Sequence, residues 1–205
     1  MAGTEGIKWI VEARVEKYTD EQVDYATART GIDAPGGDIL RHVCGTPDDG
    51  IAHAHGNLLT TVGLTAITAL LTGTGGSGAL YNLKAGSPTT NAIMGVGTSA
   101  TAAAITDVAL GSDNTANAYY QNMDATYPTV AAGVITGQCS YLTGVANFAW
   151  NEWCFASGNG AITPGIAIGS VFATNASKAM WNHKIQSLGT KTSGTWVLVA
   201  TVTLA

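Results

Sequence analysis

The second half of the chain is a succession of short β-favouring runs separated by Gly, Asn, Asp and Pro. After residue 78 these runs span residues 92–97, 134–142, 146–156, 165–173, 178–185 and 195–204. Short strands at such close spacing, with no helical periodicity between them, are typical of an antiparallel sandwich or barrel. We therefore predict a mainly β fold, an antiparallel β-sandwich or jelly-roll-like domain over residues 79–205.

The C-terminal run shows the clearest alternation of side chains. In an extended strand one face would hold Trp196, Leu198, Ala200, Val202 and Leu204. The opposite face would hold Val197, Val199, Thr201 and Thr203. The apolar first face predicts burial in the core, and the mixed second face predicts partial cover.

Aromatic side chains gather in the run at residues 146–156. Strict alternation there would point Phe148 and Trp150 away from Trp153 and Phe155, so at most half of them could share a surface. We therefore interpret these aromatics as core, and expect Trp150 or Trp153 to pack there with Trp196 and Leu198. A sugar-stacking platform and a subunit interface are the alternatives.

The first 18 residues have the pattern of a strand. Apolar and charged side chains alternate from Ile7 to Tyr18, which is typical of a half-buried strand. Because little adjacent core is visible for this strand to join, we predict that residues 1–18 form an N-terminal arm that docks on another subunit or a partner surface.

Residues 19–78 are predicted to be helix and loop packed on the body. Thr19 and Gln22 form a capping box and Gly31 can end the helix, so one short helix is expected there. Residues 32–56 are rich in Pro and Gly and predict a loop, with one short strand at about residues 39–43. A second helix is expected from a cap at Asn57 to about Leu71.

Composition argues against several classes of function. Charged residues are 11% of the 205-residue chain, the net charge is -5 and the pI is about 5.1. No basic stripe is present to neutralise phosphates, so neither nucleic acid nor an anionic membrane is an expected partner.

No signal peptide is visible, so we expect synthesis and folding in a cytoplasm. An odd number of cysteines without a C-x-x-C predicts buried thiols at Cys44, Cys139 and Cys154.

The stretch IMGVGTSATA at residues 93–102 contains a G-x-G-x-x-A pattern that begins at Gly95 and Gly97. A dinucleotide site needs this pattern between a strand and a helix within a βαβ unit. The residues that follow make a poor helix start, and further β-like runs come after them. We therefore predict a loop after this stretch and no bound nucleotide or other cofactor.

No catalytic or metal site is predicted from the remaining residues. His53 and His55 would share one face of an extended chain, but no carboxylate or cysteine stands at ligand spacing from them. The acids between residues 50 and 205 are Asp107, Asp113, Asp124 and Glu152. They form no evident catalytic motif, and no G-x-S-x-G is present, so the chain is not expected to be an enzyme.

Three stretches together resemble a family of tailed-bacteriophage virion proteins. They are IMGVGTSATAAAITDVALGSD at 93–113, ANFAWNEWCFASG at 146–158 and MWNHKIQSLGTKTSGTWVLVATVTLA at 180–205. In that family a segment similar to IGVGTGTTAPAATDTAL precedes NFxWxEWG and an ending similar to LNRKxxxLGTKxxGxxWxxxxTITL. The opening GTEGIKWIVEARVEKY also looks like that of actinobacteriophage relatives, and Cys154 stands where Gly is common.

The resemblance implies a structural protein of the virion with a β-sandwich body and no catalytic residues. Within that class we expect a capsid decoration protein that binds the major capsid protein on the outer head surface as a homo-oligomer, such as a trimer. The alternative is a tail- or baseplate-associated protein, including a fibre or host-glycan-binding module. Its location in either case would be the virion, after synthesis in the host cytoplasm.

Overall fold

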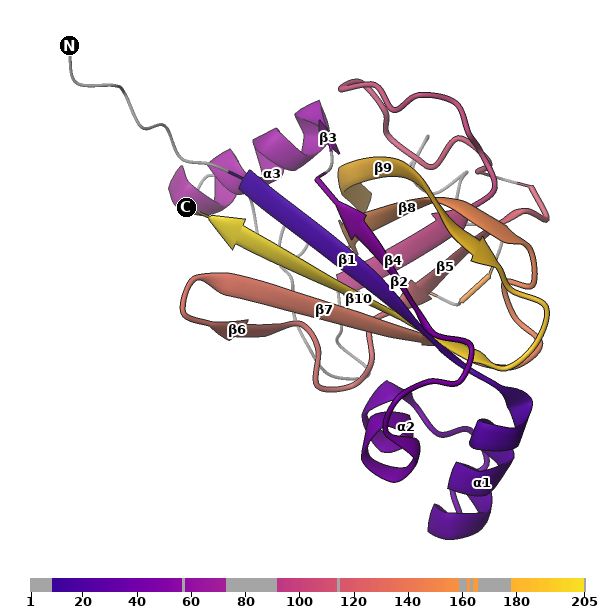
Figure 1. Cartoon of the computed structure of the whole chain (residues 1–205). Helices are drawn as coiled ribbons and strands as arrows, with labels where there is room; N and C mark the ends of the chain where they lie inside the picture. The colour runs from indigo at the N-terminus through magenta and orange to yellow at the C-terminus, as the bar shows by residue number, and fades with distance from the viewer. Residues whose placement is uncertain are drawn as a thin grey trace.

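The computed structural model describes residues 9–56, 58–72, 92–113, 115–158, 162, 164–165 and 178–204. These residues form ten strands in two antiparallel five-stranded sheets, together with three helices (Figure 1). The predicted mainly β, sandwich-like fold is confirmed, with three helices where one or two were expected. No described helix is long and apolar enough to cross a bilayer.

Each sheet is assembled from distant parts of the chain. The first sheet has the order β2 (Ile51–His55), β1 (Trp9–Tyr18), β10 (Thr195–Leu204), β7 (Val134–Tyr141) and β6 (Thr129–Ala131). The second sheet has the order β3 (Leu58–Leu59), β9 (Lys178–Thr190), β8 (Ala149–Gly158), β4 (Ala92–Gly97) and β5 (Ala118–Asn122). Both the first 60 residues and the last 30 therefore contribute to both sheets.

The central position of β1 corrects the predicted domain boundaries. β1 pairs with β10 along its whole length and with β2 on its other side, so its described residues are part of the sandwich rather than a separate arm. Residues 1–8 of the predicted arm lie outside the described residues. A strand with one apolar and one charged face has the same pattern in an arm as within a half-covered sheet. Residues 79–205 alone are thus not the complete sandwich.

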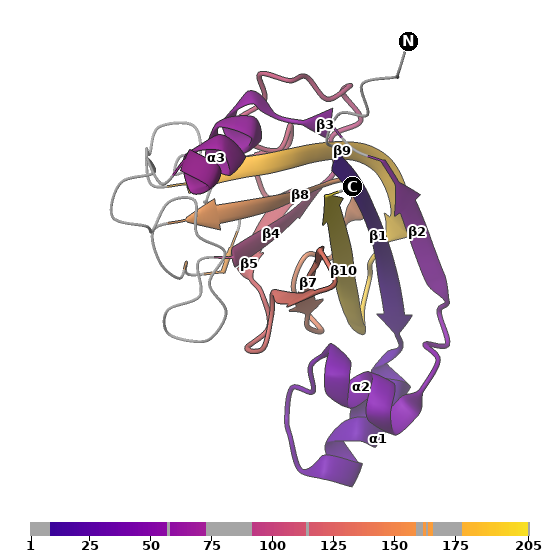
Figure 2. The same cartoon turned by 90° about the vertical axis from the view of Figure 1, so that its left-hand side faces the viewer.

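The faces of β10 are buried as its alternation predicted. Trp196, Leu198, Ala200 and Val202 lie in the core between the sheets. On the opposite face, Val197 and Val199 pack under two helices, α1 (Asp20–Thr30) and α2 (Gly37–Cys44). These helices lie beyond one end of the sandwich (Figures 1 and 2).

A register shift places three aromatic residues of β8 on one face. Trp150, Trp153 and Phe155 all lie in the core between the sheets, with Phe148 packed against them. The predicted division of these side chains between two faces is therefore wrong. The pairing of β8 with β9 shifts between Trp150 and Glu152, and the irregularity moves every later side chain to the other face. The core assignment of Trp150, Trp153, Trp196 and Leu198 is confirmed.

The first predicted helix is confirmed, and the predicted short strand that follows it is a helix instead. α1 has the predicted Thr19–Gln22 capping box and ends at Gly31 in the left-handed conformation, with φ 73°. The strand predicted at residues 39–43 is wrong, because α2 occupies this segment. α2 packs so closely on β10 that a Cβ at Gly37 would lie 2.6 Å from Val197.

The predicted second helix is α3 (Thr61–Thr72), which starts later than expected because β3 precedes it. The Thr60 hydroxyl accepts the Gly63 amide at 3.0 Å and so supplies a cap, whereas Asn57 lies outside the described residues. Of the predicted run at 165–173, only Gly165 is described, where it bridges to Tyr120.

Candidate functional site

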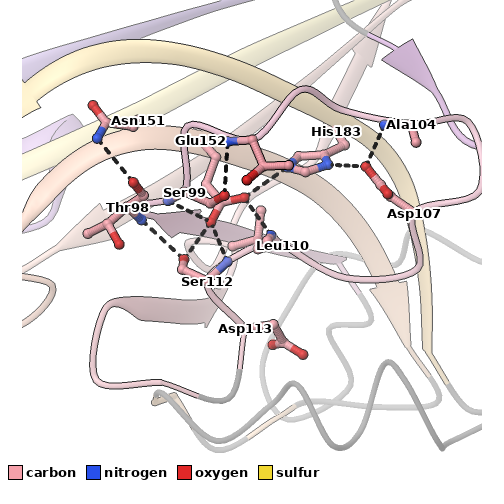
Figure 3. Close-up of polar contacts among 12 residues, drawn as sticks. Thr98, Ser99, Ala104, Asp107, Leu110, Ser112, Asp113, Asn151, Glu152 and His183 are labelled. Carbon is pink, nitrogen blue, oxygen red and sulfur yellow. Dashed lines mark hydrogen bonds and ion pairs between the residues drawn. The ribbon is translucent and has the colours of Figure 1, made fainter.

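Three ionisable side chains meet on the outer face of the second sheet (Figure 3). They are Glu152 from β8, His183 from β9 and Asp107 from the segment between β4 and β5. We call them the carboxylate–histidine cluster, and we call residues 98–113 and 115–117 the covering loop. The side chains of His183 and Glu152 expose only 3% and 0% of their surface, and that of Asp107 exposes 27%.

Glu152 reaches the covering loop because of two local features. The register shift in β8 points its side chain outward, away from the tryptophans of the core. Beside it on β4 is Gly97, where a Cβ would lie 2.4 Å from the Glu152 carboxylate and 2.1 Å from the Ser112 hydroxyl. Only a residue without a side chain leaves room at this position for the carboxylate.

Both oxygens of Glu152 accept hydrogen bonds from the covering loop. Oε1 accepts the amides of Ser112 at 2.8 Å and Ser99 at 3.2 Å, and the Ser112 hydroxyl at 2.5 Å. Oε2 accepts the Gly111 amide at 2.7 Å. A single buried carboxylate thus ties three residues of the loop to β8.

His183 lies between two carboxylates. Its Nε2 is 2.9 Å from Oε2 of Glu152, and its Nδ1 is 2.6 Å from Oδ2 of Asp107. The same Asp107 oxygen accepts the Ala104 amide at 2.7 Å, so it too is held within the loop. Ionised carboxylates only accept hydrogen bonds, so both contacts are hydrogen bonds only when both ring nitrogens donate, that is, in the imidazolium form of His183.

The electrostatics of the cluster agree with this protonation state. Burial by itself would lower the pKa of His183, but the hydrogen bonds and charges of Glu152 and Asp107 outweigh it and raise that pKa above its usual value. Burial would likewise raise the pKa of Glu152, but its bonds to His183, Ser112 and Gly111 lower it instead. Each partner therefore favours the charged form of the other.

This arrangement is suited to holding a loop and not to proton transfer. A general base needs a free lone pair, and an imidazolium with both N–H groups bonded to carboxylates has none. The Ser112 hydroxyl is directed at Glu152 rather than at the histidine, so the two do not form a serine–histidine pair. The cluster instead fixes the covering loop so that its Leu110 packs in an apolar cluster with Ile93 and Cys154.

The other acids of the second half serve other contacts. Asp113 accepts the Tyr120 hydroxyl at 2.8 Å near the cluster. Asp124, in the segment between β5 and β6, accepts hydrogen bonds from two side chains of β7, Gln138 at 2.7 Å and Ser140 at 2.6 Å. The Ser140 hydroxyl in turn accepts the Gly37 amide at 2.8 Å, so this network anchors the start of α2.

The G-x-G-x-x-A pattern is part of a strand and its following loop. Gly95 and Gly97 lie within β4, and no helix forms in the described residues 98–117. A Cβ at Gly95 would lie 2.5 Å from the ring of Tyr120, so this glycine permits close packing on β5. The pattern therefore lacks the strand–turn–helix context of a phosphate site.

His53 and His55 share one face of β2, as an extended chain predicts, with their rings stacked 6.3 Å apart. Arg14 pairs with His53 across the strands, and Glu12 lies 3.6 Å from His55. Within the part of the chain that the structure describes, no group of three or more His, Cys, Asp or Glu residues is arranged to hold a metal ion.

Sequence reasoning placed Asp107 and Glu152 among the four acids of residues 50–205 and did not connect them with His183. Asp107 lies 45 positions before Glu152 in the chain, and His183 lies 31 positions after it. Only the β8–β9 pairing and the covering loop bring the three together. One signal was present in the sequence: Glu152 is the single charged residue of the largely apolar run FAWNEWCFA. A buried charge in such a run requires a partner.

Comparisons of the chain with protein-family models, with curated proteins and with solved structures found no match.

Proposed function

We propose that the chain is a structural, non-enzymatic protein of a tailed-bacteriophage virion that decorates the outer surface of the capsid. The resemblance to virion proteins rests on three stretches, at residues 93–113, 146–158 and 180–205. Each stretch supplies one member of the carboxylate–histidine cluster: Asp107, Glu152 and His183, respectively. This observation supports the proposal, because one ionisable residue from each shared stretch joins the three stretches in the fold.

The proposed mechanism is stabilisation by binding. A protein that binds the assembled capsid but not its separated subunits lowers the free energy of the assembled form. The partner is the major capsid protein, and the chain binds as a homo-oligomer, for which a trimer is the proposed state. Buried networks at both faces of the sandwich favour this role, since they provide a rigid body for repeated attachment.

Copy number is the first test. A decoration protein should be present on the order of hundreds of copies per virion, in a simple ratio to the symmetric capsid lattice. Quantitative gel staining of purified virions against the major capsid protein measures this ratio. A few dozen copies or fewer would contradict decoration and support the alternative, a tail- or baseplate-associated protein.

Heat stability tests the mechanism. Particles that lack the chain should release DNA at a lower temperature than complete particles, and addition of the purified chain should restore the difference. Equal release temperatures would exclude a cementing role. Turnover of peptidoglycan or capsule by the purified chain, if lost in Glu152→Gln, would contradict the non-enzymatic assignment.

A further inference from the structure

We propose that the carboxylate–histidine cluster is a pH-dependent latch, which holds the covering loop closed while His183 is protonated and releases it when His183 loses its proton. The proposal does not depend on the virion function. It rests on the placement of one titratable ring between two carboxylates, at 2.6 Å and 2.9 Å.

Neutral histidine cannot make both contacts. It has one N–H and one lone pair, so deprotonation would leave a ring nitrogen lone pair facing a carboxylate oxygen of Glu152 or Asp107. A buried acceptor without a donor is costly, as is a repulsive contact between two acceptors. Closure of the loop is therefore coupled to the second proton on His183.

The other groups around His183 do not replace this charge. On β8, the thiol of Cys154 is directly opposite, and burial keeps it neutral by raising its pKa well above the usual value. On β3 the opposite residue is Leu58, and α3 contains no charged residue. The next residue along β9, Lys184, donates to the His55 carbonyl at 2.9 Å on the other sheet. In the covering loop, Asp113 is bonded to Tyr120 rather than to the ring.

The direction of the pH effect follows from linkage. Because the folded-state pKa of His183 is raised, its contribution to closure is complete below the unfolded pKa of about 6.5 and is lost as pH rises through the folded value. The pKa of Glu152 is lowered, so its contribution is present above its unfolded value and lost as pH falls through the folded one. The latch is thus closed in weakly acidic solution and opens as pH rises through the raised pKa of His183.

Hydrogen exchange of the covering loop tests this directly, because the amides of Ser99, Ala104, Gly111 and Ser112 all bond to the two carboxylates. Mass spectrometry would give protection factors for this loop between pH 6 and 9, after correction for the intrinsic exchange rate at each pH. The protection factors of β10, measured in the same samples, would serve as the internal reference. Protection should fall about tenfold for each unit by which the pKa of His183 in the closed state exceeds that in the open state. Constant protection across the titration would overturn the proposal.

Two variants of His183 distinguish the effect of its positive charge from the effect of the imidazole ring itself. His183→Gln, which is neutral and has a single donor group, should show at pH 6 the low protection that the natural chain shows only at alkaline pH. His183→Arg keeps a cation at all these pH values and should remove the pH dependence. His55→Arg, at an exposed position, is the matched control and should behave as the natural chain does. Full protection in His183→Gln, or an unchanged pH profile in His183→Arg, would contradict the latch.

A measurement on the unmodified chain covers the case in which neither variant folds. The ring Cε1–H of His183 can be titrated by NMR beside those of His42, His53 and His55. The latch requires that the pKa of His183 lie above the usual histidine value of about 6.5. A pKa of His183 at or below that usual value would refute the proposal.

Discussion

The indole rings of Trp150 and Trp196 meet edge to face across the sandwich, with their centroids 5.0 Å apart and their planes at 68°. One ring comes from β8 of the second sheet and the other from β10 of the first. Tyr141 of β7 also meets Trp150 edge to face, with ring centroids 4.8 Å apart. Since these contacts join the two sheets directly, they are where loss of one side chain should weaken the whole fold.

Trp150→Ala should destabilise the protein by about 3–5 kcal/mol, because it removes a fully buried ring and leaves a cavity between the sheets. Chemical denaturation followed by circular dichroism would measure the change. Tyr25→Ala on α1 also removes a large aromatic side chain, but from a position that is 57% exposed, and should change stability by less than about 0.5 kcal/mol. Similar effects of the two substitutions would argue against a Trp150-centred core.

β1 should behave as a central strand. Val11 is fully buried, whereas the side chain of its neighbour Glu12 is 60% exposed on the outer face. Val11→Asn should cost at least about 2 kcal/mol, since it places an amide in the core, and Glu12→Asn should be nearly neutral. Thermal unfolding measures both, and equal melting temperatures would mean that β1 is dispensable to the sandwich.

Removal of residues 1–18 is the stronger form of this test. The truncated chain lacks the strand between β2 and β10, so we expect it to lose cooperative unfolding. A truncated chain that still melts in one sharp transition would restore the earlier expectation of a separate arm.

Gly63 is where α3 contacts β9 most closely. A Cβ there would lie 2.2 Å from the carbonyl oxygen of Trp181, and the backbone of a central strand cannot move aside easily. Gly63→Ala should therefore destabilise the protein, although alanine is favoured over glycine within a helix by about 1 kcal/mol. Leu64→Ala, at the next and exposed position, is the control. A higher melting temperature for Gly63→Ala would show that α3 is not held against β9.

Lys191 is fully buried and its amine donates to three oxygens, of Leu142, Val145 and Asn147, at 2.8–3.1 Å. Lys191→Met would leave these acceptors unpaired and should cost about 1–3 kcal/mol at pH 7. Lys184→Met, which removes a single bond to an exposed carbonyl, should cost less.

The loss of unfolding free energy caused by Lys191→Met should grow with pH. Burial lowers the pKa of Lys191 to about 8, so the folded chain releases this proton before the unfolded chain does. The natural protein should therefore become more stable relative to the variant as pH rises above about 8. A difference in unfolding free energy that is constant from pH 7 to 10 would contradict the lowered pKa.

Several features of the fold could be predicted because their causes are local. The α1 helix begins at the Thr19–Gln22 capping box and ends at Gly31, and all three residues lie within one short segment. The two faces of β10 follow from strict alternation, since no bulge interrupts its pairing with β1 and β7. The sandwich class likewise follows from the number and spacing of the short runs.

Tertiary structure decided the features that depend on pairing between distant residues. The register shift beside Glu152 is a property of the β8–β9 pairing, and it placed three aromatics inside and the carboxylate outside. α2 formed where a strand was predicted, because packing of Leu40 and Gly37 on β10 outweighs weak local preference. The pKa of His183 is raised only when folding places its ring between Asp107 and Glu152, because these hydrogen bonds and charges do not surround the ring in the extended chain.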